Sequence, residues 1–90
     1  MTAMLDDVEV KITWSEGLVR LFEGRALVKG HEIRFEGVVY PSVGGPNVGT
    51  RLSQESLEQL RALGYTEEEI EQIIADLNNA VLNGEARFVE

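Results

Sequence analysis

The residue spacing that comes closest to known chemistry lies in the glycine-rich segment Gly44–Arg51. It contains the pattern G-x-x-x-x-G, followed by a hydroxyl group and a cation. A nucleotide-hydrolysing P-loop needs Lys and then Ser or Thr after the second glycine, because the amine reaches the phosphates and the hydroxyl binds magnesium. Here Thr50 comes first and Arg51 second, with no lysine between them and Gly49. The segment is therefore not a P-loop.

A simpler anion or small-ligand site remains open at residues 41–51. Backbone amides of the glycines, the start of a following helix near Ser53 and the Arg51 guanidinium could bind an anion together. The alternative is a flexible connector between a sheet and a helix. The candidate ligand-binding side chains are Tyr40, Asn47, Thr50 and Arg51.

Catalytic and metal-binding constellations are missing from the sequence. His31 is the single histidine, it falls at a predicted hairpin tip, and there is no cysteine. Four glutamates between Glu67 and Glu71 lack the spacing of a calcium loop, and negative charge at the start of a helix is favourable in its own right. We therefore expect no catalytic residue, no metal, no cofactor and a non-enzymatic protein.

The charge balance restricts the choice of partners. The formal net charge is −8, with 16 acidic and 8 basic residues. Direct nucleic-acid binding and docking on anionic lipid both need a basic surface, so neither is expected. No apolar run reaches the ~20 residues of a membrane span, and residues 1–7 have no signal-peptide pattern. We expect a cytoplasmic protein whose partners are proteins.

The hydrophobic period changes near Pro41, from steps of two to steps of three and four. This change predicts an α+β fold of two layers, in which an antiparallel β-meander of about four strands precedes a two-helix hairpin packed on one face. A short C-terminal strand is also expected. The predicted single domain 1–90 divides into an N-terminal tail (1–7), the β-meander (8–40), a Gly/Pro-rich loop (41–52), the helical hairpin (53–83) and the C-terminal strand (84–90).

The meander is predicted from alternation and from glycines at the breaks. With Glu23-Gly24 and Gly30-His31 as two-residue turns, Leu21 faces Ala26 and Val28 faces Ile33, and the apolar residues share one face. Trp14 then ends the first strand in the core. Leu18, Phe22 and Leu27 fall on the other face, where they either contact a second copy or lie beneath a loop or terminus.

The helical hairpin is predicted from its capping residues. Ser53 suits the N-cap of the first helix, and Gly64 suits its C-terminal end. Thr66 and Glu69 form a T-x-x-E capping box at the start of the second helix.

Three functions from different classes fit this reading. The first is a non-enzymatic protein-interaction or regulatory module that forms a homodimer or binds a larger partner, supported by edge strands and apolar outer positions. The second is an acidic, phage-type mimic of nucleic acid that inhibits a DNA-binding enzyme. The third is anion or small-ligand binding at residues 41–51.

Overall fold

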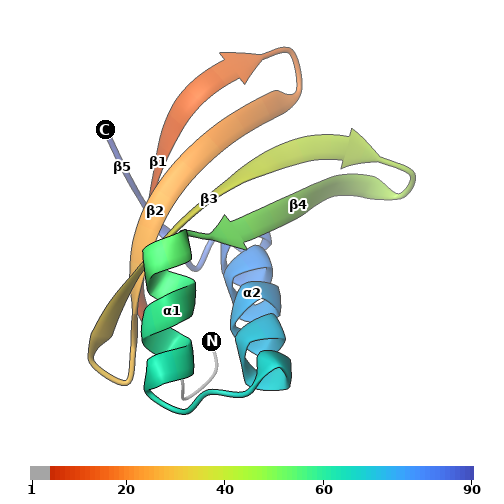
Figure 1. The fold of residues 1–90 in the computed structure, drawn as a ribbon. Helices are drawn as coiled ribbons and strands as arrows, with labels where there is room; N and C mark the ends of the chain where they lie inside the picture. Colours follow the sequence, from red (N-terminus) through yellow and green to blue (C-terminus); the bar gives the residue numbers. More distant parts are fainter. Residues whose placement is uncertain (1–4) are drawn as a thin grey trace.

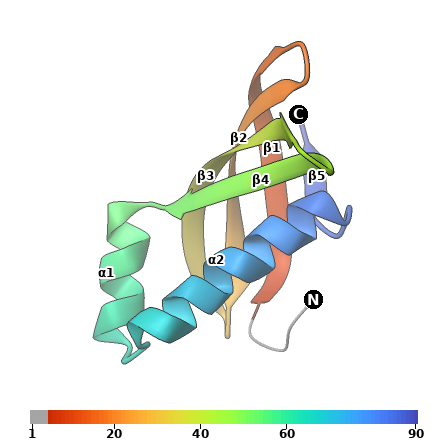
Figure 2. The same ribbon diagram turned by 90° about the vertical axis from the view of Figure 1, so that its right-hand side faces the viewer.

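The computed structural model describes residues 5–90, which form a five-stranded sheet with two helices on one face (Figures 1 and 2). The sheet order is β4-β3-β2-β1-β5; β1 to β4 are antiparallel neighbours, and β5 runs parallel to β1. This confirms the predicted α+β fold. The elements are β1 (Leu5–Glu16), β2 (Val19–Val28), β3 (His31–Ser42), β4 (Gly45–Leu52), α1 (Gln54–Ala62), α2 (Glu67–Leu82) and β5 (Arg87–Val89).

The fourth strand comes from the segment predicted as a loop. Residues 41–52 continue β3 and then return as β4, with Val43-Gly44 as the turn. Gly44, the second residue of the turn, has φ +93°, and a positive φ in this place is the type II pattern that favours glycine. Val48 and Leu52 are buried, so β4 contributes to the core despite its glycines and proline. The glycine-rich composition concealed a strand whose turn needs only two residues.

Glu23-Gly24 is not a turn but lies within β2, which runs unbroken to Val28. Gly24 of β2 pairs with Phe35 of β3. Two residues earlier in β2, on the same face, Phe22 pairs with Gly37 of β3. A methyl group at Gly24 would lie 2.6 Å from the Phe35 ring, and one at Gly37 would lie 2.4 Å from the Phe22 ring. Each glycine therefore makes room for the aromatic ring opposite it.

The turn between β2 and β3 also differs from the prediction. It consists of Lys29-Gly30, both with positive φ, and Val28 pairs with His31. Positive φ at both central residues is the type I′ pattern, which favours glycine in the second place. The predicted register is therefore off by two residues, with Ala26 facing Ile33. A shift of two preserves the faces of the sheet, so Ala26, Val28 and Ile33 are buried as predicted. Leu21 was predicted on the same face but is 42% exposed on the opposite one, because β2 has no turn at Gly24.

The helices begin and end as predicted. Ser53 caps α1, Thr66 and Glu69 form the capping box of α2, and Gly64 follows α1 with φ +94°. A second serine, which was not predicted, joins α1 to β3: the buried Ser56 hydroxyl accepts a 2.8 Å hydrogen bond from the Arg34 amide. Figure 2 shows α2 crossing the sheet face with α1 to one side.

The chain ends differ in how well they were predicted. The predicted tail 1–7 is wrong for residues 5–7, because β1 begins at Leu5 and that side chain is fully buried; residues 1–4 lie outside the described part. The C-terminal strand is confirmed as β5, at the edge of the sheet beside β1.

Two glycine substitutions test the role of the aromatic–glycine pairs. Gly24→Ala should lower the free energy of unfolding by about 1–3 kcal/mol, because the new methyl group overlaps both the Phe35 ring and the Glu9 carbonyl. Gly49→Ala is the matched control, since its methyl group would meet only Val38, at 3.9 Å, and should change stability by less than about 1 kcal/mol. Urea unfolding of both variants measures the difference, and equal effects would contradict the proposed packing.

Candidate functional site

The four predicted ligand-binding residues are largely engaged within the protein. Thr50 donates a hydrogen bond to Asn78 of α2, and the Asn47 side chain accepts one from the next amide in the chain, at 2.9 Å. Arg51 forms an ion pair with Glu36, and the hydrogen bond within that pair raises the pKa of Arg51. Tyr40 pairs with Asn47 across the hairpin and is partly exposed.

The parts of the predicted anion site are far apart. Gly44 and Gly45 lie at the turn, whereas Ser53 follows the opposite end of β4. The seven residue steps of extended chain from Gly45 to Leu52 span about 23 Å. Thr50 and Arg51 also project to opposite faces of the sheet, as neighbours in a strand do. The structure thus brings Tyr40 and Asn47 together but does not join the glycines to the helix start.

The three predicted interface residues occupy different environments. Leu18 is exposed in the turn between β1 and β2, and Leu27 is half-buried. Phe22 is only 2% exposed and packs edge-to-face on Phe35, with ring centroids 6.3 Å apart. Its predicted place on the outer face was wrong, because without a turn at Gly24 the alternation of β2 turns Phe22 inward.

Trp14 was predicted to lie in the core, but the structure places it on the surface. It is 46% exposed and pairs with Leu21, after an irregularity in the β1–β2 register between Ile12 and Trp14. An extra residue in one strand moves the following side chains to the other face. The bulge therefore carries Trp14 out of the core.

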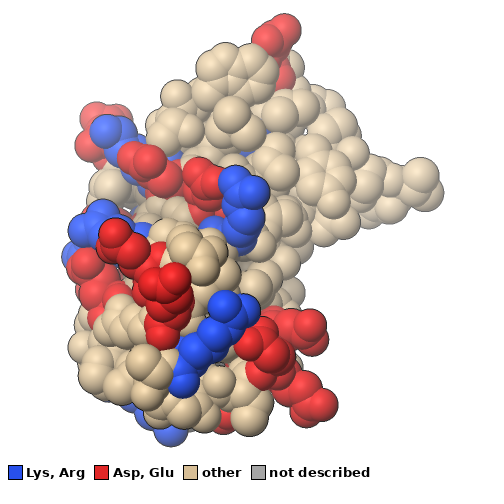
Figure 3. Space-filling model, in the orientation of Figure 1, with Lys and Arg blue, Asp and Glu red and all other residues tan. Residues whose placement is uncertain are grey.

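Two hairpin arms project away from the helices (Figure 1): the β1–β2 arm, residues 12–21, and the β3–β4 arm, residues 37–50. The β3–β4 arm has no charged residue, and the β1–β2 arm has only Glu16 and Arg20. Figure 3 shows both arms almost free of charged side chains, which gather instead over the rest of the molecule.

The outer face of the arms, away from the helices, carries a row of residues paired across all four strands. The row consists of Trp14, Leu21, Val38 and Gly49. A hollow of about 550 Å³ runs along this row from Thr13 on β1 to Gly49 on β4, where the missing side chain leaves it open. Leu21, Val38 and the Arg51–Glu36 ion pair also line it. This row was missed, since the sequence prediction placed Trp14 in the core and Gly49 in a loop.

The inner face of the arms is also apolar and open. A groove of about 370 Å³ lies between the arms and the end of α2. Its apolar lining includes Ile12, Val39, Val48, Leu82 and Phe88. Phe88 is 52% exposed and Leu82 41%. Both faces of the same strands therefore present apolar side chains that the helices leave uncovered.

The free edge of β4 is poorly suited to pairing with another strand. Pro46 has no amide hydrogen, and the Val48 amide is engaged by the Asn47 side chain. A proline on the edge is one of the devices by which edge strands avoid aggregation, and the Asn47 hydrogen bond occupies a second amide of the same edge.

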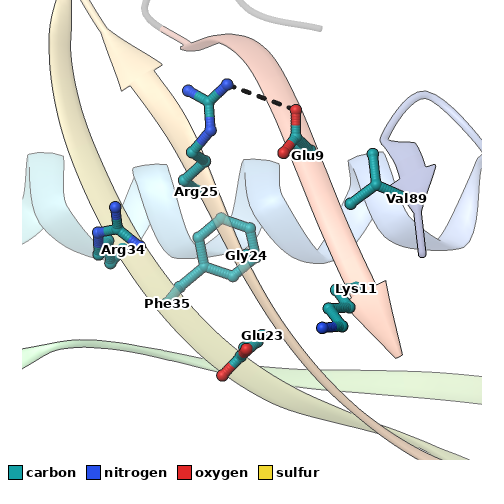
Figure 4. A pocket seen from close by; sticks show the side chains of 8 residues that line it. All are labelled: Glu9, Lys11, Glu23, Gly24, Arg25, Arg34, Phe35 and Val89. Atoms are coloured by element: carbon teal, nitrogen blue, oxygen red, sulfur yellow. Dashed lines mark hydrogen bonds and ion pairs between the residues drawn. The ribbon is translucent and has the colours of Figure 1, made fainter. Parts of the chain in front are cut away.

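At the end of the sheet where the helices pack on the inner face, the outer face is polar instead (Figure 4). Glu9 forms ion pairs with Arg25 and Arg87, at the side of a hollow of about 270 Å³. The hydrogen bond from Arg87, together with the charges of both arginines, holds the pKa of Glu9 below its ordinary value, although burial acts the other way. These interleaved charges form a network in which the cations are already paired.

Negative charge is concentrated in the helical layer. Residues 53–86 contain eight acidic residues and a single basic residue, Arg61, so they account for −7 of the net charge of −8. Arg61 pairs with Glu67, and their hydrogen bond lowers the pKa of Glu67. The sheet is thus nearly neutral, while the side that carries the helices is acidic.

Other kinds of site find no support in residues 5–90. No group of three or more histidine or acidic side chains in this range is arranged to hold a metal ion, and neither helix described there has the length and apolar character to span a membrane. No protein-family model, curated protein or solved structure matches the chain. Its function must be inferred from its own residues.

The Glu9 network gives a pH-dependent prediction. A carboxylate whose pKa is lowered in the folded state stabilises the fold above its unfolded pKa, ordinarily 4.5, and this stabilisation is lost as the pH falls through the folded value. Glu9→Gln should therefore be less stable than the wild type at pH 7, with a difference that shrinks below about pH 4.5. Urea unfolding at a series of pH values tests this, and a constant difference across the series would contradict it.

Proposed function

We propose that this protein is a non-enzymatic protein-interaction module that docks through its two arms and first of all with a second copy of itself. The observation that carries the proposal is that the projecting sheet is apolar on both faces. A sheet with one exposed face usually alternates apolar and polar residues, whereas two apolar faces are typical of a sheet buried on both sides.

The distribution of exposed apolar residues supports this assignment. Trp14 and Leu21 lie on the outer face and Phe88 and Leu82 around the inner groove, each more than 40% exposed. Contiguous apolar surface of this kind marks interaction sites in soluble proteins. Burial of such residues would also add to the modest core of a 90-residue chain.

An acidic mimic of nucleic acid is the second candidate, favoured by the charge of the helical layer. Its exposed carboxylates cluster at the start of α2, in Glu67, Glu68, Glu69 and Glu71. Beyond Asp76 the helix has no further charged residue. The acidic surface therefore does not follow the full length of α2, as an imitation of a phosphate backbone would require.

Surface variants separate these candidates in a capture experiment from source-cell lysate. Leu21→Ser should reduce binding of added chain of the same sequence about tenfold or more, because it removes an exposed apolar side chain from the outer face of the arms. Phe88→Ser removes an exposed side chain of β5 at the inner groove and should reduce binding of a partner that docks there. Leu63→Ser is the matched control: it removes an equally exposed leucine, 46% exposed, at the end of α1.

The effect of salt on capture distinguishes the interaction module from the acidic mimic. Docking through the apolar faces of the arms should survive high salt. If both variants, Leu21→Ser and Phe88→Ser, capture their partners as well as the wild type, and capture is abolished by salt, the proposal fails and the acidic mimic takes its place.

A further inference from the structure

We infer that two copies of this chain dock outer face to outer face, with Trp14 of each copy seated in the hollow over Gly49 of the other. The inference rests on the proposed interaction function and adds the partner surface and its geometry. It follows from the order of residues in one row of the sheet and from the placement of charge.

Along this row the side chains decrease in size, from the indole of Trp14 to Gly49, which has no side chain. Trp14 on β1 pairs with Leu21, Leu21 with Val38, and Val38 with Gly49 on β4. Directly paired residues share a face of the sheet. With strands about 4.8 Å apart, the two ends of the row are separated by about 14 Å.

This order is self-complementary under a two-fold axis. An axis that runs parallel to the strands, midway between two stacked sheets, reverses the row of the second copy. Trp14 then lies over Gly49 of that copy and Leu21 over Val38, and the same contacts recur in the other direction. Such reciprocal contacts define an isologous dimer, and aligned strands are one of the two common ways in which sheets stack.

The Gly49 end can accept a large side chain. The hollow measures about 550 Å³, and a methyl group placed at Gly49 would meet nothing closer than Val38 at 3.9 Å. Trp14 is 46% exposed, and its indole ring fits in the part of the hollow over Gly49. A tryptophan in a pocket is a common energetic centre of a protein interface.

The placement of charge favours the outer face over any other approach of two such chains. In this arrangement the acidic helical layers lie on the two far sides. Stacked sheets are about 10 Å apart, and a further layer of similar thickness separates each helical layer from its sheet, so the acidic layers are about 30 Å apart. That distance exceeds the Debye length of about 8 Å at physiological salt. Contact through the helices would set the two acidic surfaces against each other.

The neighbouring row limits the contact to the arms. It contains Lys11, Glu23, Glu36 and Arg51. The same axis would bring Lys11 over Arg51 and Glu23 over Glu36, which are like charges. Residual repulsion at this boundary, together with the net charge of −8, predicts a dimer that tightens as salt is added.

An exchange of the two end residues tests the geometry, with sedimentation equilibrium as the measurement. Gly49→Trp blocks the hollow and Trp14→Gly empties it, so each should weaken dimerisation about tenfold or more. The double variant, Trp14→Gly with Gly49→Trp, recreates the same pair with the partners exchanged and should regain most of the lost affinity. Far-ultraviolet circular dichroism and thermal unfolding establish that each variant is folded.

Gly49→Ala serves as a second, milder probe, because its methyl group leaves most of the hollow free and should leave the dimer intact. A wild-type chain that stays monomeric at the highest concentration overturns the inference. So does a folded double variant that is no tighter than either single variant. A dimer that is lost in Leu21→Ser or Phe88→Ser but unaffected by Gly49→Trp would retain the interaction function and overturn only this geometry.

Discussion

The structure depends on the reciprocal packing of two phenylalanines against two glycines at the centre of the sheet. Phe22 lies over Gly37 and Phe35 over Gly24, and the two rings meet edge-to-face at 6.3 Å between centroids. A strand interior usually loses stability at a glycine, but here the opposing ring takes up the space. These pairs hold β2 and β3 together as long, continuous strands from which both arms extend.

The length of these strands creates the uncovered surface. The helices begin only after Leu52, where Ser53 and Ser56 attach α1 to the backbone of Arg34 in β3. The helical layer therefore packs at one end of the sheet and leaves the arms beyond it (Figure 1). Charge follows the same division, with the net negative charge on the helical layer and almost no charged residues on the arms. A solvated surface would not need this separation, whereas a docking surface on a strongly acidic chain does.

The success of sequence reasoning depended on whether a residue acts locally. The capping residues Ser53, Thr66 and Gly64 act within one turn of chain, and their roles were predicted correctly. Gly24 looked like a turn because its close contact is with Phe35, eleven positions further along the sequence, and that false turn misplaced Phe22. Trp14 was misplaced because a bulge leaves no mark on the alternation of residue types. Gly49 was predicted to lie in a loop, so its part in a hollow on the sheet could not be recognised before β4 was known.

Amide hydrogen exchange of the wild-type chain, followed as its concentration is raised, tests the central claim most directly. If the arms are the docking surface, amides in residues 12–21 and 37–50 become more protected as the concentration rises, while those of α1 and α2 stay unchanged. Exchange rates in both arms that do not change with the concentration of the chain would contradict the account.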